Sequence, residues 1–304
     1  MKKRKKRVPK RRPLPSRGSD SILDVYNVDR LLETEKKFDQ VSRFHWDYFY
    51  ELAYQRKQIK ADLVMALHQA CLDKFHIQNW FRVVRAKYAN TPLSVTGSLV
   101  DPGGRFNIGR IYSQCFPPFP ALYLGEDFNT CVQEVFPSKL ANLANALKDD
   151  DMNLGSIQSL HAVRVSGLLE KVLDLGNTDS LKPFVQTMKN INLPQKFFDE
   201  AKRLSINLQL IRSPKKMLSE LMHKNWKYMP TVYDIPSNPQ VFGQLVYHAG
   251  IDGILYPSAR TGKKCLAIYT RNFAHTSSEI EITDEVASCV SLKKINRSNF
   301  RDCE

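Results

Sequence analysis

Short β-type runs separated by turn-rich segments dominate the sequence from Trp80 onward. Helical segments are fewer, and the two kinds of element follow one another without the regular strand–helix alternation of a parallel sheet. The pattern therefore predicts an α+β fold rather than a doubly wound one. The predicted strands are Trp80–Val84, Ala121–Leu124, Leu160–Val165, Val172–Leu175, Gly253–Tyr256, Cys265–Tyr269 and Cys289–Leu292.

Two helices in this part of the chain have clear limits. Residues 239–249 have Asn238 as a candidate N-cap and Gly250 directly after the last helical position. A shorter helix is expected from about 127 to 136, where the apolar residues form one stripe. Glu134 lies roughly 120° from the centre of that stripe at 100° per residue. This angle allows Glu134 to face either a cleft edge or water, and periodicity alone favours water.

The region before the first strand, residues 21–79, is expected to be helical because apolar positions recur near a period of 3.6 between Leu52 and Cys71. Six aromatic residues lie between Phe44 and Tyr54, interleaved with acidic side chains rather than Lys or Arg. This composition favours packing in a core or at an interface over stacking on nucleic-acid bases.

The positive charge of the chain is concentrated at its start. Residues 1–20 carry a net +9 of the total +14, which leaves +5 for the remaining residues. A basic block of this kind is expected to be disordered, and it can bind nucleic acid, an anionic membrane surface or an import receptor. Nucleic-acid binding through residues 2–17 is therefore one hypothesis, and a solvated tail without a specific partner is an equal one.

Several protein classes are not expected. Apolar stretches such as Leu63–Leu67 are far shorter than the roughly 20 residues that cross a bilayer. No apolar segment follows the basic start, so we expect no secretory signal peptide. The six cysteines form no C-x-x-C pair and the seven histidines are scattered, so reduced cysteines and no metal site are predicted.

Three segments carry residues suited to chemistry. Asp101–Asn107 contains two glycines that allow a tight turn directly before Arg105. Phe119–Gly125 is a short strand that precedes the helix of Glu134. Ala249–Arg260 is a helix end, a turn and a buried strand followed by a proline and a serine. That serine, Ser258, lacks the G-x-S-x-G context of a nucleophile, so we interpret it as a hydrogen-bonding group for a ligand.

Taken together and in this order, five elements resemble the RES domain, a family named for its Arg, Glu and Ser. They are Phe81–Val84, Gly103–Asn107, Ala121–Leu124, Glu134 and Gly253–Arg260. The resemblance covers about residues 80–273. It implies a fold similar to that of ADP-ribosyltransferases and a pocket for NAD. Residues 80–304 would then form the domain with a long insertion at about 137–236, and residues 1–79 have no counterpart.

Carried over by position, the resemblance assigns a role to each of five residues. Arg82 and Arg105 match the two family arginines, which suit the pyrophosphate because a guanidinium binds two oxygens. Tyr123 would stack on the nicotinamide or ribose, and Ser258 would bond to the carboxamide or a phosphate. Glu134 would stabilise the positive charge that develops on the ribose or hold the ribose hydroxyls. Glu134, Arg105 and Arg82 are thus the expected catalytic residues.

The implied activity is cleavage of the nicotinamide–ribose bond of NAD by hydrolysis or phosphorolysis, as in bacterial toxins of the family. An antitoxin or immunity protein would then be a partner, and the bacterial cytoplasm is the simplest location. The alternative within the family is a protein ADP-ribosyltransferase, with a protein side chain as acceptor. Delivery into a target cell, with nuclear entry through the basic tail, and a degenerate fold used only for interaction are further alternatives.

Overall fold

The computed structural model describes residues 28–111, 115–135, 160–208 and 210–304. The chain divides into two compact units, Met1–Arg43 and Phe44–Glu304. In the first unit the described residues form the start of helix α1 (Val28–Gln58). The second unit holds the sheet and all the other described helices. The predicted basic tail, residues 1–20, lies outside the described residues.

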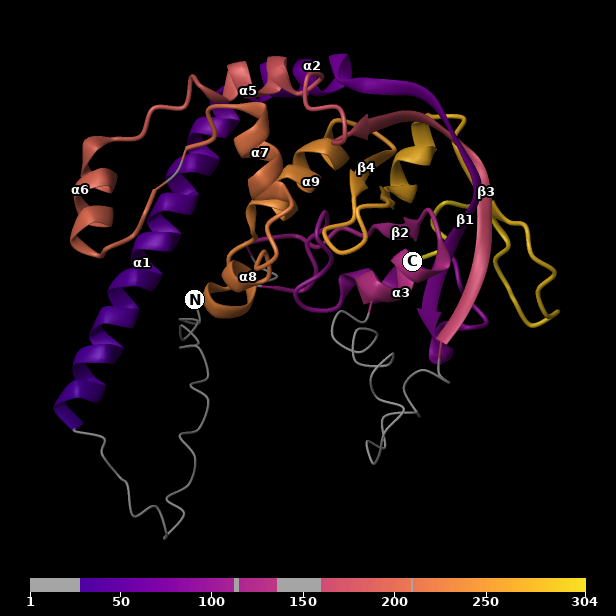
Figure 1. Cartoon of the computed structure of the whole chain (residues 1–304), viewed down its shortest axis with the longest axis horizontal. Helices are drawn as coiled ribbons and strands as arrows, with labels where there is room; N and C mark the ends of the chain where they lie inside the picture. The colour runs from indigo at the N-terminus through magenta and orange to yellow at the C-terminus, as the bar shows by residue number, and fades with distance from the viewer. Residues whose placement is uncertain (1–27, 112–114, 136–159, 209) are drawn as a thin grey trace, which may run out of the picture. The chain divides into compact units, whose positions relative to one another are not determined.

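A seven-stranded sheet organises the second unit, in the order β1-β2-β5-β4-β3-β6-β7. Figure 1 shows the long strands β1 and β3 side by side. Because β1 also pairs with β3, the five strands β1, β2, β5, β4 and β3 close into a small barrel, and β6 and β7 extend it from β3. The strands are β1 (Cys71–Arg85), β2 (Leu122–Gly125), β3 (Leu160–Asp174), β4 (Gly253–Pro257), β5 (Lys264–Ile268), β6 (Glu279–Ile282) and β7 (Lys294–Ile295).

The two long strands β1 and β3 form the antiparallel backbone of the barrel. Their pairing runs from Cys71 opposite Leu173 to Arg85 opposite Leu160, with one register shift between Ile77 and Trp80. On its other edge β3 pairs in parallel with β4 and antiparallel with β6. A Cβ at Gly167 would lie 2.2 Å from the Glu279 carbonyl oxygen, so the close approach of β6 to β3 requires glycine there.

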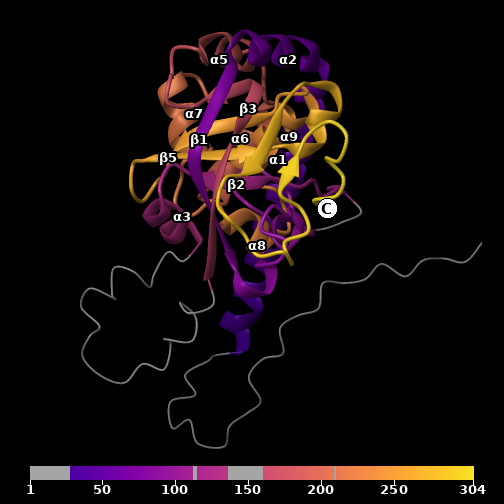
Figure 2. The same cartoon turned by 90° about the vertical axis from the view of Figure 1, so that its right-hand side faces the viewer.

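The other described helices lie outside the sheet. They are α2 (Lys60–Gln69), α3 (Phe128–Val135), α5 (Lys182–Met188), α6 (Gln195–Arg203), α7 (Pro214–Leu221), α8 (Tyr228–Tyr233) and α9 (Asn238–His248), with 3-10 turns η1 (Ala86–Tyr88), η2 (Thr96–Leu99) and η4 (Thr270–His275). Both cartoon views place α2 beside α5 (Figure 2). The N-cap of α9 is Ser237, in a capping box completed by Gln240, and the predicted N-cap Asn238 is instead the first helical residue.

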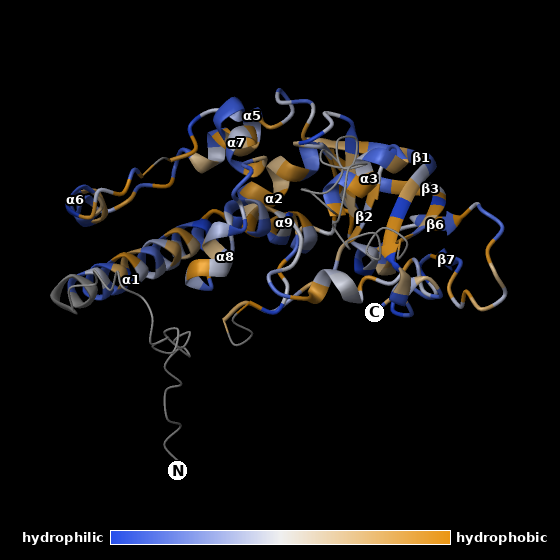
Figure 3. Ribbon diagram, turned by 60° about the horizontal axis from the view of Figure 1, so that its bottom comes forward, coloured by the Kyte–Doolittle hydropathy of each residue, from blue (hydrophilic) through white to orange (hydrophobic). Residues whose placement is uncertain are grey.

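Side chains of the central strands alternate between two hydrophobic cores. In β4, Ile254 and Tyr256 point into the core shared with the helices, whereas Leu255 points into the other core. In β5, Ala267 points into the core shared with the helices and Leu266 points into the other core. Both faces are therefore buried, which explains why these strands read as continuous apolar runs. Figure 3 shows the resulting hydrophobic colour on the strands of the barrel.

The structure confirms most of the predicted strands and corrects one. Leu160–Val165 and Val172–Leu175 are the two ends of the single strand β3. The prediction of a strand at Cys289–Leu292 is wrong, because these residues lie in the loop between β6 and β7. Their apolar character has another cause: Val290 is buried and Leu292 packs against the barrel core.

Two predicted boundaries also require correction. The helical region does not reach residue 79, because Cys71–Asn79 continues β1 and pairs with β3. The predicted insertion at 137–236 contains β3, which is a barrel strand, so only the α5–α8 segment lies outside the sheet. Residues 137–159 of the predicted insertion are outside the described residues. The expected likeness to ADP-ribosyltransferases stays a prediction.

Part of the aromatic cluster in α1 packs into the core as predicted, whereas Tyr50 and Tyr54 are exposed. Phe44 is fully buried, and it makes an edge contact with Phe197 in α6. The ring of Phe116 stacks on Trp46 and meets Phe49 edge-on. Residues 44–58 therefore belong to the same folded unit as the barrel rather than to a separate lead-in region.

Gly243 allows helix α9 to pack closely against the loop that contains Phe106. A Cβ at this position would lie 2.1 Å from the Phe106 carbonyl oxygen. An alanine in a helix interior is normally better than glycine by about 1 kcal/mol. We expect the opposite sign for Gly243→Ala, a loss of about 1–3 kcal/mol in the free energy of unfolding, because α9 is forced away from the loop.

Gly97→Ala is the matched control, since its Cβ would meet only the Tyr88 side chain at 3.8 Å. Urea unfolding of both variants measures the difference. A Gly243→Ala protein that is more stable than wild type would contradict the packing of α9 on this loop.

Candidate active site

The glycine turn predicted to present an arginine is built against the aromatic residue of β2. Gly103 has a φ of +96°, a conformation that favours glycine. A Cβ at Gly104 would lie 2.3 Å from the hydroxyl oxygen of Tyr123, so the turn can approach the ring only without a side chain. The Tyr123 hydroxyl accepts a hydrogen bond from the Phe106 amide at 3.0 Å. Burial raises the pKa of Tyr123, which stays a neutral phenol.

Asn107 fastens this turn with all four of its side-chain hydrogen bonds. Its Oδ1 accepts from the Gly104 amide at 2.9 Å and from the Tyr123 hydroxyl at 2.8 Å. Its Nδ2 donates to the carbonyls of Ser98 and Phe119. The residue is fully buried, and its complete pairing removes the cost of burying an amide.

Gln240 clamps the same turn from α9. Its Nε2 donates to the carbonyls of Pro102 at 2.7 Å and Asn107 at 3.1 Å, while its Oε1 accepts from the Ser237 amide. The S-x-x-Q spacing signals a capping box in the sequence. Its second role, holding a loop more than a hundred residues away, has no local signature.

Arg105 leaves the turn and is almost entirely buried, with 9% of its surface exposed. Its Nη1 donates to the carbonyls of Leu221 and His223, which lie at and just after the end of α7. Its Cζ lies 5.7 Å from the ring centroid of Trp226. Burial lowers the pKa of Arg105, and Glu134 is among the groups that oppose this shift. Nε and Nη2 have no protein partner among the described residues and can bind a ligand.

Glu134 lies near the end of α3, which Asp127 caps by accepting a bond from the Thr130 amide at 2.7 Å. Its Oε1 accepts a hydrogen bond from the Ser258 hydroxyl at 2.6 Å. Periodicity alone favoured a water-facing Glu134, and the structure corrects this by placing the residue in the wall of a cavity.

Ser258 is bonded differently from the sequence-based expectation. Its hydroxyl donates its only proton to Glu134, and its oxygen accepts from the amides of Arg260 and Thr261, both at 3.2 Å. A hydroxyl has one donor and two acceptor sites, so no capacity remains for a ligand. The prediction that Ser258 bonds to a carboxamide or phosphate is corrected: in this structure it positions the carboxylate.

Arg82 is also engaged within the protein. Its guanidinium donates to the carbonyls of Pro92, Tyr123 and Ser94 at 3.0–3.3 Å. Burial lowers the pKa of Arg82 to about 10. These contacts tie β1 to β2 and to the loop before η2, so Arg82 supports the wall of the site.

One cavity of about 1050 Å³ brings these residues together. Four predicted residues, Arg82, Arg105, Tyr123 and Glu134, line it, and Ser258 reaches it through its bond to Glu134. The volume lies at the upper end of small-molecule sites and suits a dinucleotide. Among the described lining residues Glu134 is the only carboxylate.

Two cysteines, Cys131 and Cys265, also line the cavity. Burial raises the pKa of Cys131 to about 12 and raises that of Cys265 as well. Both thiols are therefore protonated at neutral pH and are poor nucleophiles. All six cysteines of the chain are free.

Sequence reasoning missed the residues that the segment after α7 contributes. Lys224, Trp226 and Lys227 line the cavity, as do Tyr228 and Val232 of α8. The basic–aromatic run Lys-Asn-Trp-Lys was the available signal. It carried little weight because nothing in the local pattern connects it to the glycine turn.

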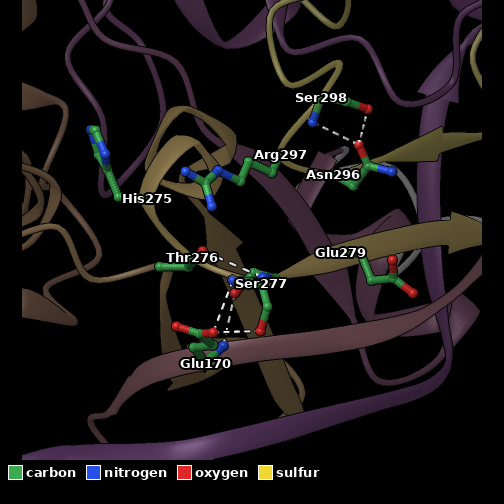
Figure 4. A pocket seen from close by; sticks show the side chains of 9 residues that line it. Glu170, His275, Thr276, Ser277, Glu279, Asn296, Arg297 and Ser298 are labelled. Atoms are coloured by element: carbon green, nitrogen blue, oxygen red, sulfur yellow. Dashed lines mark hydrogen bonds between the residues drawn. The ribbon is translucent and has the colours of Figure 1, made fainter.

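A second, polar hollow of about 560 Å³ lies beside β6 and β7 (Figure 4). Its Glu170 accepts hydrogen bonds from the amide and hydroxyl of Ser277, and its Glu279 pairs with Lys294 at 2.8 Å. Both carboxylates are thus engaged, and no predicted site residue lies there. The larger cavity is therefore the candidate active site.

In the described ranges, no three His, Cys, Asp or Glu side chains are grouped as metal ligands would be. Helices that are both long and apolar enough to cross a bilayer are also absent from these ranges.

Arg82 and Arg85 lie on the same strand, and their substitution should change the free energy of unfolding by different amounts. Arg82→Ala leaves three carbonyls without their donors, and we expect the free energy of unfolding to fall by about 3 kcal/mol. Arg85→Ala, an exposed arginine on the same strand, should change it by less than about 0.5 kcal/mol. Chemical unfolding compares the two. If Arg82→Ala unfolds at the wild-type denaturant concentration, Arg82 does not support the wall.

Comparison with known proteins relates this chain to one family. A family model described as the RES domain matches residues 79–287. A chain in the crystal structure of the M. tuberculosis MbcT–MbcA toxin–antitoxin complex is similar at 14% identity and a TM-score of 0.42, over 80% of this chain and 96% of that one. No curated protein matches. Because the family model spans more than half of the sequence, the chain belongs to the RES domain family.

Proposed function

We propose that this protein cleaves the bond between nicotinamide and ribose in NAD. The observation that carries the proposal is the presence of Glu134 and Arg105 in one cavity, with Ser258 fixing the carboxylate. Membership of the RES domain family supports NAD as the substrate, as the sequence resemblance implies. NAD would be a substrate here rather than a resident cofactor.

The chemistry needs one well-placed negative charge. When the C–N bond breaks, its electron pair leaves with nicotinamide, which departs neutral and needs no general acid. Positive charge then develops on the ribose, and the Glu134 carboxylate in the cavity wall stabilises it. Water attacks the ribose and yields ADP-ribose, whereas inorganic phosphate as the acceptor yields the phosphorylated product.

Of the remaining residues, Arg105 and Tyr123 can bind the substrate and Arg82 has a positioning role. Arg105 has a free guanidinium edge for the pyrophosphate, and its two carbonyl partners hold the other edge in place. Tyr123 offers only its ring, because its hydroxyl is engaged by Asn107 and Phe106. Arg82, bonded to three carbonyls, acts through the loop that it supports.

A protein ADP-ribosyltransferase is the second candidate, and one observation favours it. Three apolar side chains that line the cavity are exposed to solvent: Val135 at 40%, Tyr228 at 55% and Val232 at 36%. Exposed apolar groups around a site are typical of protein docking. An acceptor protein would contact them, and so would an antitoxin or immunity protein if the enzyme acts as a toxin. Nucleic-acid binding through residues 2–17 concerns a part of the chain outside the described residues.

Glu134→Ala tests the proposal. We expect kcat for nicotinamide release from NAD to fall by about 10²–10³, because the transition-state charge loses its partner. The control is Gln133→Ala, a neighbour on α3 that does not line the cavity, and it should keep wild-type kcat.

Nicotinamide and ADP-ribose are followed by chromatography with and without inorganic phosphate, with the unfolding midpoint of each variant recorded. Equal turnover by wild type and Glu134→Ala would rule out the assignment of Glu134. Release only after addition of an acceptor protein would favour the transferase.

A further inference from the structure

The cavity holds more positive charge than NAD requires. Five cationic side chains line it in the described part of the chain, against the single carboxylate Glu134: they are Arg82, Arg105, Lys224, Lys227 and Arg260. NAD carries two negative charges on its pyrophosphate and one positive charge on its pyridinium ring. The lining is therefore matched to a ligand of greater negative charge.

The three arginines of the cavity do not account for the excess. Arg82 is held by three carbonyls, and Arg105 keeps one edge of its guanidinium for the pyrophosphate. Arg260 lies close enough to Arg105 to contribute to lowering its pKa. Glu134 opposes this shift, but its single charge offsets only one of the five cations that line the cavity.

The lysines form a separate group at the exposed side of the cavity. Lys224 and Lys227 are both exposed and lie on either side of Trp226 in the chain. The Lys227 Nζ lies 5.4 Å from the Trp226 ring centroid, and the Arg105 Cζ lies 5.7 Å from it. The indole therefore links the lysine group to the arginine expected to bind the pyrophosphate.

We propose that the lysine group binds a phosphate monoester, and that the site selects a dinucleotide bearing a third phosphate, NADP, over NAD. A phosphate monoester adds about −1.5 to −2 charge at neutral pH, which matches the two positive charges of Lys224 and Lys227. Lysine suits it as a compact point charge with three donors. This inference rests on the proposed function, because it concerns the substrate class of the same site.

Equilibrium binding tests the inference separately from turnover. Titration calorimetry at fixed ionic strength measures the Kd of NAD and of NADP for the full chain carrying Glu134→Gln, which is expected to slow cleavage. We expect NADP to bind at least tenfold more tightly. Adding Lys224→Ala and Lys227→Ala should abolish this preference and change the Kd of NAD by less than about threefold.

A charge-matched control replaces Lys202 and Lys293, exposed lysines outside the cavity, and should keep the preference. Equal Kd values for the two dinucleotides, or a preference that survives loss of Lys224 and Lys227, would overturn the inference. If the Glu134→Gln protein binds NADP tightly but the wild type cleaves neither dinucleotide, the inference is upheld and the proposed function is contradicted.

Free inorganic phosphate could bind the lysine group in place of the phosphate monoester of a dinucleotide. If Lys224 and Lys227 hold it as the acceptor, phosphate will accelerate NAD cleavage by wild type but not by the lysine variant, and NADP will show no binding advantage. That pattern would overturn the inference while leaving NAD cleavage intact.

Discussion

The buried side-chain amide of Asn107 is the contact on which the site depends. It joins the glycine turn, the β2 tyrosine and two loop carbonyls through four hydrogen bonds. An amide buried without partners would cost several kcal/mol, so this network has one favourable arrangement and specifies the turn uniquely. Gln240 repeats the principle from α9, where three loop carbonyls surround its Nε2. The position of Arg105 follows from both amides.

The carboxylate side of the cavity is organised in the same way from different elements. Ser258, in the turn after β4, uses every hydrogen-bonding site of its hydroxyl to join that turn to Glu134 on α3. Helix α3 and the turn after β4 are thereby held together at the cavity. Preorganisation of this kind lowers the cost of orienting a charge during the reaction.

Local signals in the sequence predicted part of this arrangement. The continuous apolar runs of β4 and β5 identified strands buried on both faces, and the order of the arginine, glutamate and serine segments indicated one site. The role of Ser258 was not predictable, because its partners lie at positions 134, 260 and 261 and only the fold brings the first of these to it.

Long-range pairing explains the other departures from expectation. Cys71–Asn79 reads as the end of a helix because its neighbours are helical, yet β3 supplies a strand partner along its length. The lysine group and Trp226 were missed for a similar reason: their segment lies between α7 and α8, and only packing against Arg105 makes it part of the cavity.

The central claim is that Glu134 faces the ribose of a bound dinucleotide. The most direct measurement is a crystal structure of the Glu134→Gln protein soaked with NAD. We expect the ribose C1′ of the nicotinamide half beside residue 134 and the pyrophosphate against the free edge of Arg105. A dinucleotide bound elsewhere, or one whose nicotinamide ribose lies away from residue 134 in this cavity, would contradict the account.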